Sequence, residues 1–403
     1  MSHSEHIVIV GGGLAGATTA IELRKRGHAG QITLISSEEH LPYERPPLSK
    51  DFLQGKSAVK DFTVREEEYY TEHDITLQRG VTVTGLDRAE RVVRLSDGTS
   101  LGYDQLVLAT GARPNTGGSA PIEGAQLPGV HLLRSIEDSQ ALRENLGEGS
   151  TLAIVGSGWI GMEVAASATQ LGAKVTVITP DAIPLAAVLG ERFGEHLLKI
   201  HRAQGVDFKL QTKVRSIHAD HGELLVDTDA EPIRADHVLL AIGAVPNTEL
   251  AAAAGIQTDS GIVVDASLRS SDSNVLAIGD VAQAFNTTLR RQLRVEHWDN
   301  AARQGALAAS TLTGGDDEYD WYPYFFTDQF DVGMEFVGQA EAGDEAEFRG
   351  GEDEFIVFYL REGVIRAAMN VNLWDVNDTL RGLIGRSIEP ERLRDPQIDL
   401  ESL

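Results

Sequence analysis

The 403-residue sequence contains no cysteine. The chain therefore cannot form a disulfide, a thiolate metal site or a redox-active thiol pair. This absence excludes disulfide reductases and cysteine-based peroxidases, so any electron chemistry must pass through a cofactor. The twelve histidines show no ligand spacing on an expected helix, and no serine stands in a nucleophile elbow. We expect no metal site.

Long apolar runs and an excess of positive charge are also missing. No segment is long and apolar enough to cross a bilayer, and the first strand is expected from about residue 6, which leaves no room for a signal peptide. We expect a cytoplasmic protein. Aspartate plus glutamate total 61 against 35 lysine plus arginine, a net charge of −26. Nucleic acid and anionic membranes are therefore disfavoured as partners. The length suggests two to three domains.

A glycine-rich turn follows the first apolar run. Residues 7–10 are β-branched, which is typical of a strand buried on both faces, and Gly11, Gly13 and Gly16 follow with the spacing G-x-G-x-x-G. Gly11 would allow a tight turn, Gly13 would let a pyrophosphate approach the backbone, and Gly16 would let the next helix pack closely. A second strand is expected over residues 31–35. Together these features predict a dinucleotide-binding unit.

Two features after this unit are candidates for cofactor contacts. Glu38 lies 22 residues after the third glycine, close to the position of a ribose-binding acid. The tandem prolines at 46 and 47 predict a rigid loop that presents Arg45 and Lys50. The loop alone leaves two interpretations open: a solvated basic loop, or contacts of Arg45 with a pyrophosphate and of Lys50 with an electron-rich ring.

The same pattern returns in the middle of the chain. An apolar strand over residues 151–155 precedes Gly156, Gly158 and Gly161, and a helix and a further strand over residues 174–178 follow. Two complete units of this kind in one chain are far more specific than one, and they imply two dinucleotides brought face to face.

The second unit lacks an acid at the usual recognition position. Thr179 stands where Asp or Glu would select a free ribose 2′-hydroxyl, and Asp181 follows after Pro180. Because no arginine stands nearby to bind a 2′-phosphate, the sequence favours NADH, with NADPH as the other possibility.

Other segments place residues at the ends of buried strands. Thr110 and Gly111 end one such strand, either as a ligand-contacting turn or as a simple strand terminus. Asp280 ends the strand that begins at residue 275, either as the N-cap of a helix from residue 281 onward or as a partner of a cofactor hydroxyl. From about residue 325 the pattern changes to antiparallel β, with a hairpin over residues 355–371 and a closing helix over residues 378–384.

The motifs together resemble the FAD-dependent, NAD(P)H-using ferredoxin reductases of bacterial oxygenase systems. This family includes the putidaredoxin and rubredoxin reductases and the reductases of aromatic dioxygenases. The resemblance covers nearly the whole chain, and its most specific element is the Pro-Pro-Leu-Ser-Lys loop at residues 46–50. It is carried by residues 11–16, 41–50, 109–111, 156–166, 245–249, 279–280 and 296–298.

The resemblance implies an α/β fold with two Rossmann-like dinucleotide-binding domains, as in glutathione-reductase-like proteins, and a C-terminal α+β domain. Residues 1–115 and 245–324 would form the FAD-binding domain, residues 116–244 the NAD(P)H-binding domain, and residues 325–403 the third domain. The implied enzyme is an NAD(P)H-dependent ferredoxin reductase, a monomer or homodimer. It would pass a hydride to FAD and then single electrons to a ferredoxin-type iron–sulfur protein that serves an oxygenase.

Other functions remain open on the same fold. The protein could serve as a rubredoxin or nitrite-reductase-type electron-transfer flavoprotein. A flavin signalling protein resembling apoptosis-inducing factor belongs to a different class, because turnover matters less there. A flavin oxidase is a further alternative, and it requires oxygen for NADH consumption.

The resemblance also implies the site residues. Lys50 would contact the flavin cofactor, Trp298 would pack near the isoalloxazine, and Glu163 would lie by the nicotinamide; these three are the expected catalytic residues. Glu163 could instead be an exposed helix residue and Trp298 simply part of the core. The expected cofactor-binding residues are Gly11, Gly13, Leu14, Ala15, Gly16, Glu38, Arg45, Lys50, Val81, Ala109, Thr110, Gly111, Arg113, Gly156, Gly158, Trp159, Ile160, Gly161, Glu163, Thr179, Ile242, Gly243, Gly279, Asp280, Glu296, His297, Trp298 and Phe326.

The sequence departs from the family pattern at three places. Thr179 replaces the usual acid, which leaves the preference between NADH and NADPH open. Phe326 stands where many members carry a tryptophan beside the flavin, so the route of electron exit is open as well. Residues 36–37 are Ser-Ser in place of Gly-Asp. The basic residues Arg290, Arg291 and Arg294 are the candidates for docking an acidic ferredoxin.

Overall fold

The computed structural model describes residues 5–118 and 120–403, which divide into two compact units. Unit 1 consists of the described residues of Met1–Arg45, Ala58–Arg113 and Val245–Trp321, and unit 2 consists of those of Pro46–Ser57, Pro114–Ala244 and Tyr322–Leu403. Arg45 thus belongs to unit 1 and Lys50 to unit 2. The division into three domains stays a prediction.

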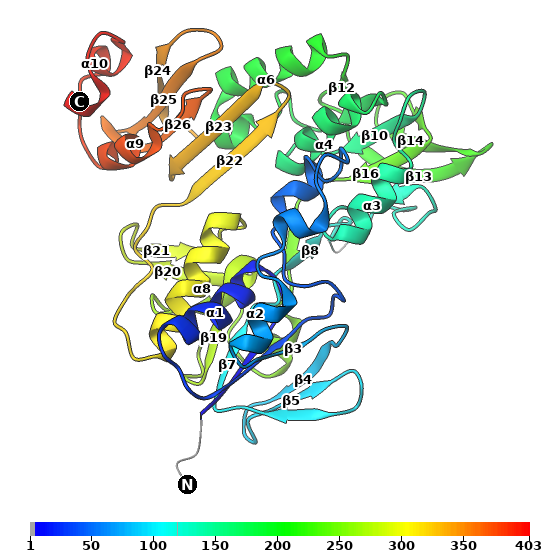
Figure 1. The fold of residues 1–403 in the computed structure, drawn as a ribbon. Coiled ribbons are helices and arrows are strands. Elements are labelled where there is room, and N and C mark those ends of the chain that lie inside the picture. The colour runs from blue at the N-terminus through cyan, green and yellow to red at the C-terminus, as the bar shows by residue number, and fades with distance from the viewer. Residues whose placement is uncertain (1–4, 119) are drawn as a thin grey trace. The chain divides into compact units, whose positions relative to one another are not determined.

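Unit 1 is built on a five-stranded parallel sheet with the order β19–β7–β1–β2–β3 (Figure 1). The central strand β1 has neighbours on both sides, and its residues Ile7, Val8 and Ile9 are fully buried, as a strand covered on both faces requires. The strands are β1 (His6–Val10), β2 (Gln31–Ile35), β3 (Ile75–Gln78), β7 (Gln105–Leu108) and β19 (Val275–Ala277).

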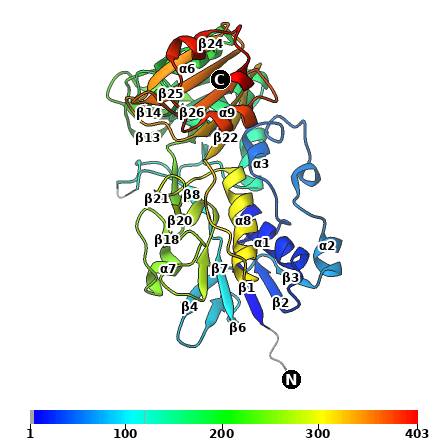
Figure 2. The same ribbon diagram turned by 90° about the vertical axis from the view of Figure 1, so that its left-hand side faces the viewer.

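Two helices of unit 1 pack side by side, α1 (Leu14–Lys25) and α8 (Trp298–Leu312), as Figures 1 and 2 both show. A Cβ on Gly305 would lie 2.6 Å from the carbonyl oxygen of Ala15, so the glycine permits this close approach. The Thr19 hydroxyl donates to the Gly305 carbonyl at 3.2 Å. Helix α8 is therefore fixed against the helix that begins at the first glycine-rich turn.

Smaller elements complete unit 1. They are α2 (Glu67–Glu72), α7 (Glu249–Ala253), the 3₁₀ turns η2 (Val59–Phe62) and η3 (Gly279–Val281), the sheet of β4 (Val83–Asp87), β5 (Val92–Leu95) and β6 (Ser100–Gly102), and the sheet of β18 (Ile262–Val264), β20 (Ala282–Asn286) and β21 (Arg291–Leu293).

Unit 2 contains a second five-stranded parallel sheet, with the order β12–β11–β10–β16–β9. Its strands are β9 (Val130–His131), β10 (Thr151–Val155), β11 (Lys174–Ile178), β12 (Asp207–Lys209) and β16 (His237–Leu240). The other elements of this part are the 3₁₀ turn η1 (Pro46–Ser49), the helices α3 (Ile136–Glu144), α4 (Trp159–Gln170), α5 (Ala186–Leu189) and α6 (Glu191–Ala203), and the strands β13 (Val214–Asp220), β14 (Glu223–Thr228) and β15 (Ile233–Ala235). The short strands β8 (Ala112–Pro114) and β17 (Ala244–Pro246) form a two-stranded sheet.

The C-terminal part of unit 2 is an antiparallel sheet with the order β22–β23–β26–β25–β24 (Figure 1). Helix α9 packs on it through the buried side chains of Leu380 and Leu383. The hairpin turn at Glu362 and Gly363 has positive φ at both residues, 53° and 71°, as a type I′ turn requires. The elements are β22 (Tyr324–Gln329), β23 (Val332–Gly338), β24 (Glu345–Gly350), β25 (Phe355–Arg361), β26 (Val364–Val371), α9 (Asn377–Leu383), α10 (Pro390–Arg394) and η4 (Leu400–Ser402).

One expectation from the sequence is wrong. No helix starts at Val281, because a single 3₁₀ turn over Gly279–Val281 is followed at once by strand β20. The cause is visible in the side chains of that strand: Ala282, Ala284 and Asn286 are buried and the residues between them are not, which is the period of a strand. Asp280 is not an N-cap, since it lies inside the 3₁₀ turn.

The described residues contain neither a helix that could span a membrane nor a cluster of metal-binding side chains. Within residues 5–118 and 120–403, no helix combines the length and the apolar character needed to span a bilayer. Over the same residues, no group of three or more His, Asp or Glu side chains lies close enough together to hold a metal ion.

Candidate functional site

The turn between β1 and α1 needs glycine at two positions for steric reasons. Gly11 has φ of +122°, and a Cβ there would lie 2.0 Å from the Ala109 carbonyl oxygen. A Cβ on Gly16 would lie 2.1 Å from the Gly11 carbonyl oxygen. The first glycine therefore makes the turn and the third brings the helix onto it, as the sequence predicted.

Gly13 differs, because neither the backbone nor packing requires it to be glycine. It is the N-cap of α1 with φ of −77°, a conformation open to any residue, and a Cβ there would meet no atom within 4 Å. The glycine thus keeps empty the space above the first N–H groups of the helix, where an anion is favoured. This open cradle fits the phosphates of a dinucleotide.

The turn between β10 and α4 in unit 2 repeats this arrangement. Gly156 has φ of +107° and a Cβ there would lie 2.4 Å from the Ala241 carbonyl oxygen, while a Cβ on Gly161 would lie 2.3 Å from that of Gly156. Gly158 is the N-cap of α4 with φ of −74°, and again no atom lies within 4 Å of its Cβ position. The chain therefore has two matching cradles, one in each unit.

The other residues expected at the FAD site of unit 1 mostly follow the carboxyl ends of its parallel strands, where ligands of such sheets bind. The backbone N–H of Val81, after β3, donates to the Ser36 carbonyl after β2 at 3.0 Å. The backbone N–H of Gly279, after β19, donates to the Gln304 side chain at 2.8 Å. This edge or its two helices hold Leu14, Ala15, Ala109, Thr110, Gly111, Asp280, Glu296, His297 and Trp298.

Glu38 and Arg45 lie together after β2. Their side chains form an ion pair with an Nη2–Oε1 distance of 2.9 Å, and the Tyr43 hydroxyl donates to the other Glu38 oxygen at 2.5 Å. The pair places an acceptor for a ribose hydroxyl beside a cation for a phosphate. Arg113, by contrast, is exposed and pairs with Glu249 at 2.8 Å.

A buried ion pair lies in unit 2. The Lys50 ammonium contacts the Glu163 carboxylate at 2.7 Å, and only 15% and 8% of the two side chains are exposed. Glu163 also accepts hydrogen bonds from the hydroxyls of Ser49, at 2.5 Å, and Thr327, at 2.7 Å. The interpretation of Glu163 as an exposed helix residue is therefore wrong. Ser49 and Thr327 had no signal of their own in the sequence.

Aromatic side chains lie beside the lysine of this pair and at the start of α4. The Lys50 ammonium lies 5.5 Å from the ring centre of Phe326, within the range of a cation–π contact. Trp159, the first residue of α4, stacks on Phe325 at 6.4 Å with nearly parallel rings. Ile160 beside it is 42% exposed. The helix that begins at the second cradle therefore also carries the buried carboxylate and an exposed apolar side chain.

The recognition position of the second unit is occupied by a small hydrogen-bonded group. Thr179 is buried, and its hydroxyl and that of Ser157, 2.9 Å apart, lie 3.2 and 3.4 Å from one carboxylate oxygen of Asp181. Asp181 itself is exposed. Ser157 is part of the glycine-rich turn, so this carboxylate is held beside the second cradle. Ile242 and Gly243 follow the neighbouring strand β16, and a Cβ on Gly243 would meet no atom within 4 Å.

The three expected docking arginines do not form one exposed group. Arg290 and Arg291 are exposed at the turn between β20 and β21. Arg294 is only partly exposed, pairs with Glu296, and donates to the Asp280 carbonyl at 3.4 Å. Arg294 is therefore placed to support the segment around Asp280.

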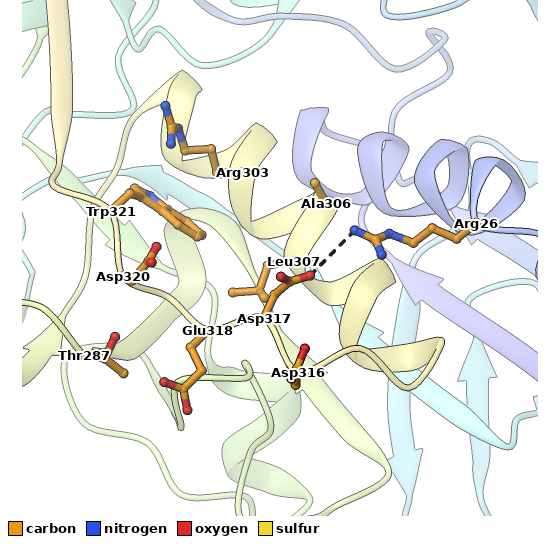
Figure 3. Close-up of a pocket in the computed structure, with 10 residues that line it drawn as sticks. All are labelled: Arg26, Thr287, Arg303, Ala306, Leu307, Asp316, Asp317, Glu318, Asp320 and Trp321. Carbon is orange, nitrogen blue, oxygen red and sulfur yellow. Dashed lines mark ion pairs between the residues drawn. The ribbon is translucent and has the colours of Figure 1, made fainter. Parts of the chain in front are cut away.

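A cavity of about 530 Å³ lies elsewhere in unit 1 (Figure 3). Four acidic residues and two arginines are among those that line it, and the side chains of Arg26 and Asp317 approach to 3.9 Å at one side. None of the residues expected in a cofactor site lines it. The lining residues are Arg26, Thr287, Arg303, Ala306, Leu307, Asp316, Asp317, Glu318, Asp320 and Trp321.

Comparison with known proteins gives consistent matches. Residues 5–305 match the family described as pyridine nucleotide-disulphide oxidoreductase, and residues 324–403 match the family described as reductase C-terminal. The ferredoxin–NAD(+) reductase component of the anthranilate 1,2-dioxygenase system of Burkholderia cepacia is 40% identical, with 99% of each chain covered. Rhodocoxin reductase of Rhodococcus erythropolis is 36% identical over 98% of this chain and 93% of its own.

A solved structure has the same fold. The chain in the covalent putidaredoxin reductase–putidaredoxin complex superimposes with a TM-score of 0.93 at 34% identity, covering 98% of this chain and 97% of that one.

Proposed function

Because this chain belongs to the pyridine nucleotide-disulphide oxidoreductase family and carries its reductase C-terminal domain, we propose that it is a ferredoxin reductase. It takes a hydride from NADH and passes single electrons to a ferredoxin-type iron–sulfur protein that serves an oxygenase. The relatives named for a dioxygenase system and for putidaredoxin support this assignment.

One observation carries the proposal: two matching glycine cradles occur in a chain without a single thiol. Bound FAD supplies the exchange between a two-electron hydride donor and a one-electron acceptor, which no side chain here can perform. In this proposal the cradle of unit 1 holds FAD, with Glu38 for a ribose hydroxyl and Arg45 for the pyrophosphate. The cradle of unit 2 holds the nicotinamide cofactor. The other residues proposed to contact the nicotinamide cofactor are Trp159, Ile160, Thr179, Ile242 and Gly243.

Lys50 and Glu163 are proposed as the groups nearest the hydride transfer. Lys50 supplies a fixed positive charge that would stabilise the negative charge that arrives with the hydride. Glu163 keeps the ammonium in place, since it accepts from it at 2.7 Å. The Phe326 ring presents its face to this ammonium. Trp298 is proposed to pack near the flavin.

NADH is the proposed donor, in preference to NADPH. Asp181 supplies the acid that Thr179 does not, because Ser157 and Thr179 bind its carboxylate beside the second cradle. A carboxylate there accepts from a free ribose 2′-hydroxyl and repels a 2′-phosphate. The cytoplasm is the proposed location, since reduced nicotinamide cofactors are supplied there.

The test is a reconstituted assay with purified protein, FAD, NADH and a bacterial [2Fe–2S] ferredoxin, run without oxygen. We expect one bound FAD per chain, bleaching of the flavin by NADH, and steady reduction of the ferredoxin. An oxidase would show no anaerobic consumption of NADH beyond one equivalent, and a signalling flavoprotein would bleach without reducing ferredoxin at a useful rate.

A further inference from the structure

Glu163 is the end of a hydrogen-bonded chain of buried side chains that continues away from Lys50. The Thr327 hydroxyl bonds to the Glu163 carboxylate at 2.7 Å, the Gln329 amide nitrogen bonds to the Thr327 hydroxyl at 3.1 Å, and the His201 Nε2 bonds to the Gln329 amide oxygen at 2.9 Å. All four residues lie in unit 2, and none is more than 6% exposed. They come from α4, β22 and α6, so the chain links three elements.

The direction of every bond in this chain is determined. Glu163, ionised beside Lys50, can only accept, so the Thr327 hydroxyl must donate to it. That hydroxyl has one proton, so Thr327 must accept from the Gln329 amide nitrogen. The Gln329 amide oxygen then faces His201, whose Nε2 must carry the proton.

The far end of the chain has one tautomer only. The Nδ1 of His201 is buried and has no hydrogen-bond partner among the described residues, so a proton there would be an unmet donor. The imidazole is enclosed by the rings of Phe330, at 4.9 Å, and Phe208, at 6.1 Å. A neutral His201 with its proton on Nε2 is the form that satisfies the whole chain.

We propose that Thr327, Gln329 and His201 are positioning residues that hold the Glu163 carboxylate in one orientation and, through it, the ammonium of Lys50. This inference rests on the proposed function, because Lys50 matters for catalysis only if it lies near the hydride transfer. Ser49 and Lys50 are neighbours in the chain, so they contact the Glu163 carboxylate from one segment only. Without a contact from a second element, the flexible side chain of Glu163 could rotate. The chain of three residues fixes it from the opposite element, β22.

The kinetic test uses Thr327→Val, which removes the hydroxyl and keeps the shape. We expect the rate of flavin reduction by NADH in stopped flow to fall about tenfold, while the amount of bound FAD and the thermal midpoint change little. Thr327→Ser keeps a hydroxyl and should restore the rate to within about twofold. Thr169→Val is the matched control, because Thr169 lies on the same helix as Glu163 and, among the described residues, its hydroxyl bonds only to the Ala165 carbonyl of that helix. It should leave the rate unchanged.

A double-mutant cycle separates positioning from packing. Gln329→Met should slow flavin reduction about fivefold on its own and have no further effect in the Thr327→Val background, since there is then no hydroxyl to orient. If the two effects multiply, or if Thr327→Val matches the wild type, the chain does not position Glu163 and the inference is overturned. Ferredoxin reduction by the wild type would meanwhile show that the proposed function stands.

The direction of the chain has a test that needs no activity. Nitrogen-15 NMR of the histidine-labelled, FAD-loaded protein should show His201 as the neutral Nε2–H tautomer at pH 7, and Gln329→Met should shift that resonance. A proton on Nδ1 in the wild type would overturn the inference, even if Thr327→Val failed to fold.

Discussion

Asp181 stands three residues beyond the end of strand β11, and its carboxylate is bound beside the second glycine turn by the hydroxyls of Ser157 and Thr179. Asp181→Ala removes an acceptor for a ribose 2′-hydroxyl and a negative charge that opposes a 2′-phosphate. We expect kcat/KM for NADH to fall about tenfold. The ratio of kcat/KM for NADH to that for NADPH should fall by a larger factor, because the repulsion of the 2′-phosphate is lost as well. Steady-state kinetics with both nucleotides measure this.

Asp207→Ala is the control for that experiment. Asp207 is an exposed acid on the next strand, β12, and it pairs with Lys209 at 2.9 Å. Its removal should leave the ratio of kcat/KM for the two nucleotides unchanged. If Asp181→Ala and the wild type had the same ratio of kcat/KM for NADH and NADPH, Asp181 would not recognise the ribose. The second unit would then have no recognition acid, because the usual position is occupied by Thr179.

His201 makes folding depend on pH. Burial lowers its pKa to about 4, and the bond to Gln329 offsets only part of this shift. Between pH 6.5 and 4 the unfolded chain binds a proton that the folded chain does not, so the free energy of unfolding falls as the pH is lowered through this range. The loss amounts to about 3 kcal/mol and is complete below pH 4.

Urea unfolding at a series of pH values checks the His201 prediction. In His201→Leu this titration is absent, so the free energy of unfolding should fall less steeply than in the wild type between pH 6.5 and 4. Parallel curves over that range would contradict the prediction.

The sequence could not identify Thr327, Gln329 and His201 as neighbours of Glu163. They lie 38 to 166 residues from it along the chain, and each is an ordinary residue for its strand or helix. Only the packing of β22 against α4, together with the bond from His201 on α6 to Gln329 on β22, brings them together. The glycines were different, because their spacing itself reflects a local geometry that five or six residues determine.

Among the elements, the two strand–turn–helix units follow the sequence to within one or two residues. Strands β2, β10 and β11 have the bounds that their apolar runs predicted. The segment after Asp280 does not, because a Gly-Asp pair at the end of a strand is compatible with a helix start and with a single 3₁₀ turn. The tertiary pairing of β20 with β18 decides between them.

The two cradles can be tested separately. Gly13→Ala and Gly158→Ala each place a methyl group where no atom of the protein lies within 4 Å, so we expect both variants to fold. Gly13→Ala should lose most of its FAD, and Gly158→Ala should keep FAD and show a raised KM for NADH. Absorbance of the purified proteins and NADH titrations measure both effects.

Gly16→Ala provides the contrast, since its methyl group would lie 2.1 Å from a backbone oxygen. It should lower the yield of folded protein itself. If Gly13→Ala instead behaved like Gly16→Ala, glycine at the second position would be needed for folding, and the open cradle would carry no function.

The β20–β21 hairpin is the element proposed to meet the ferredoxin. Reversing Arg290 and Arg291 to glutamate should raise the apparent KM for ferredoxin several-fold at low salt and leave flavin reduction by NADH unchanged. The difference should shrink at high ionic strength. Unaltered ferredoxin kinetics at low salt would remove this hairpin from the docking surface.

At the scale of the whole molecule, two features of the sequence limit what the chain can do. A net charge of −26 would repel an acidic ferredoxin, so docking has to use a local basic surface. The complete lack of cysteine leaves cofactors as the only carriers of electrons. The family relationship, the paired cradles and the buried lysine–glutamate pair agree with these limits.

The most direct measurement is anaerobic mixing of the purified, FAD-loaded protein with NADH in the presence of a [2Fe–2S] ferredoxin, followed at the absorbance of flavin and of the iron–sulfur centre. We expect the first equivalent of NADH to reduce the flavin, and the ferredoxin then to be reduced in steady state at the expense of NADH, two ferredoxins per NADH. A protein that is colourless, does not take up FAD, or leaves the ferredoxin oxidised while NADH persists would contradict it.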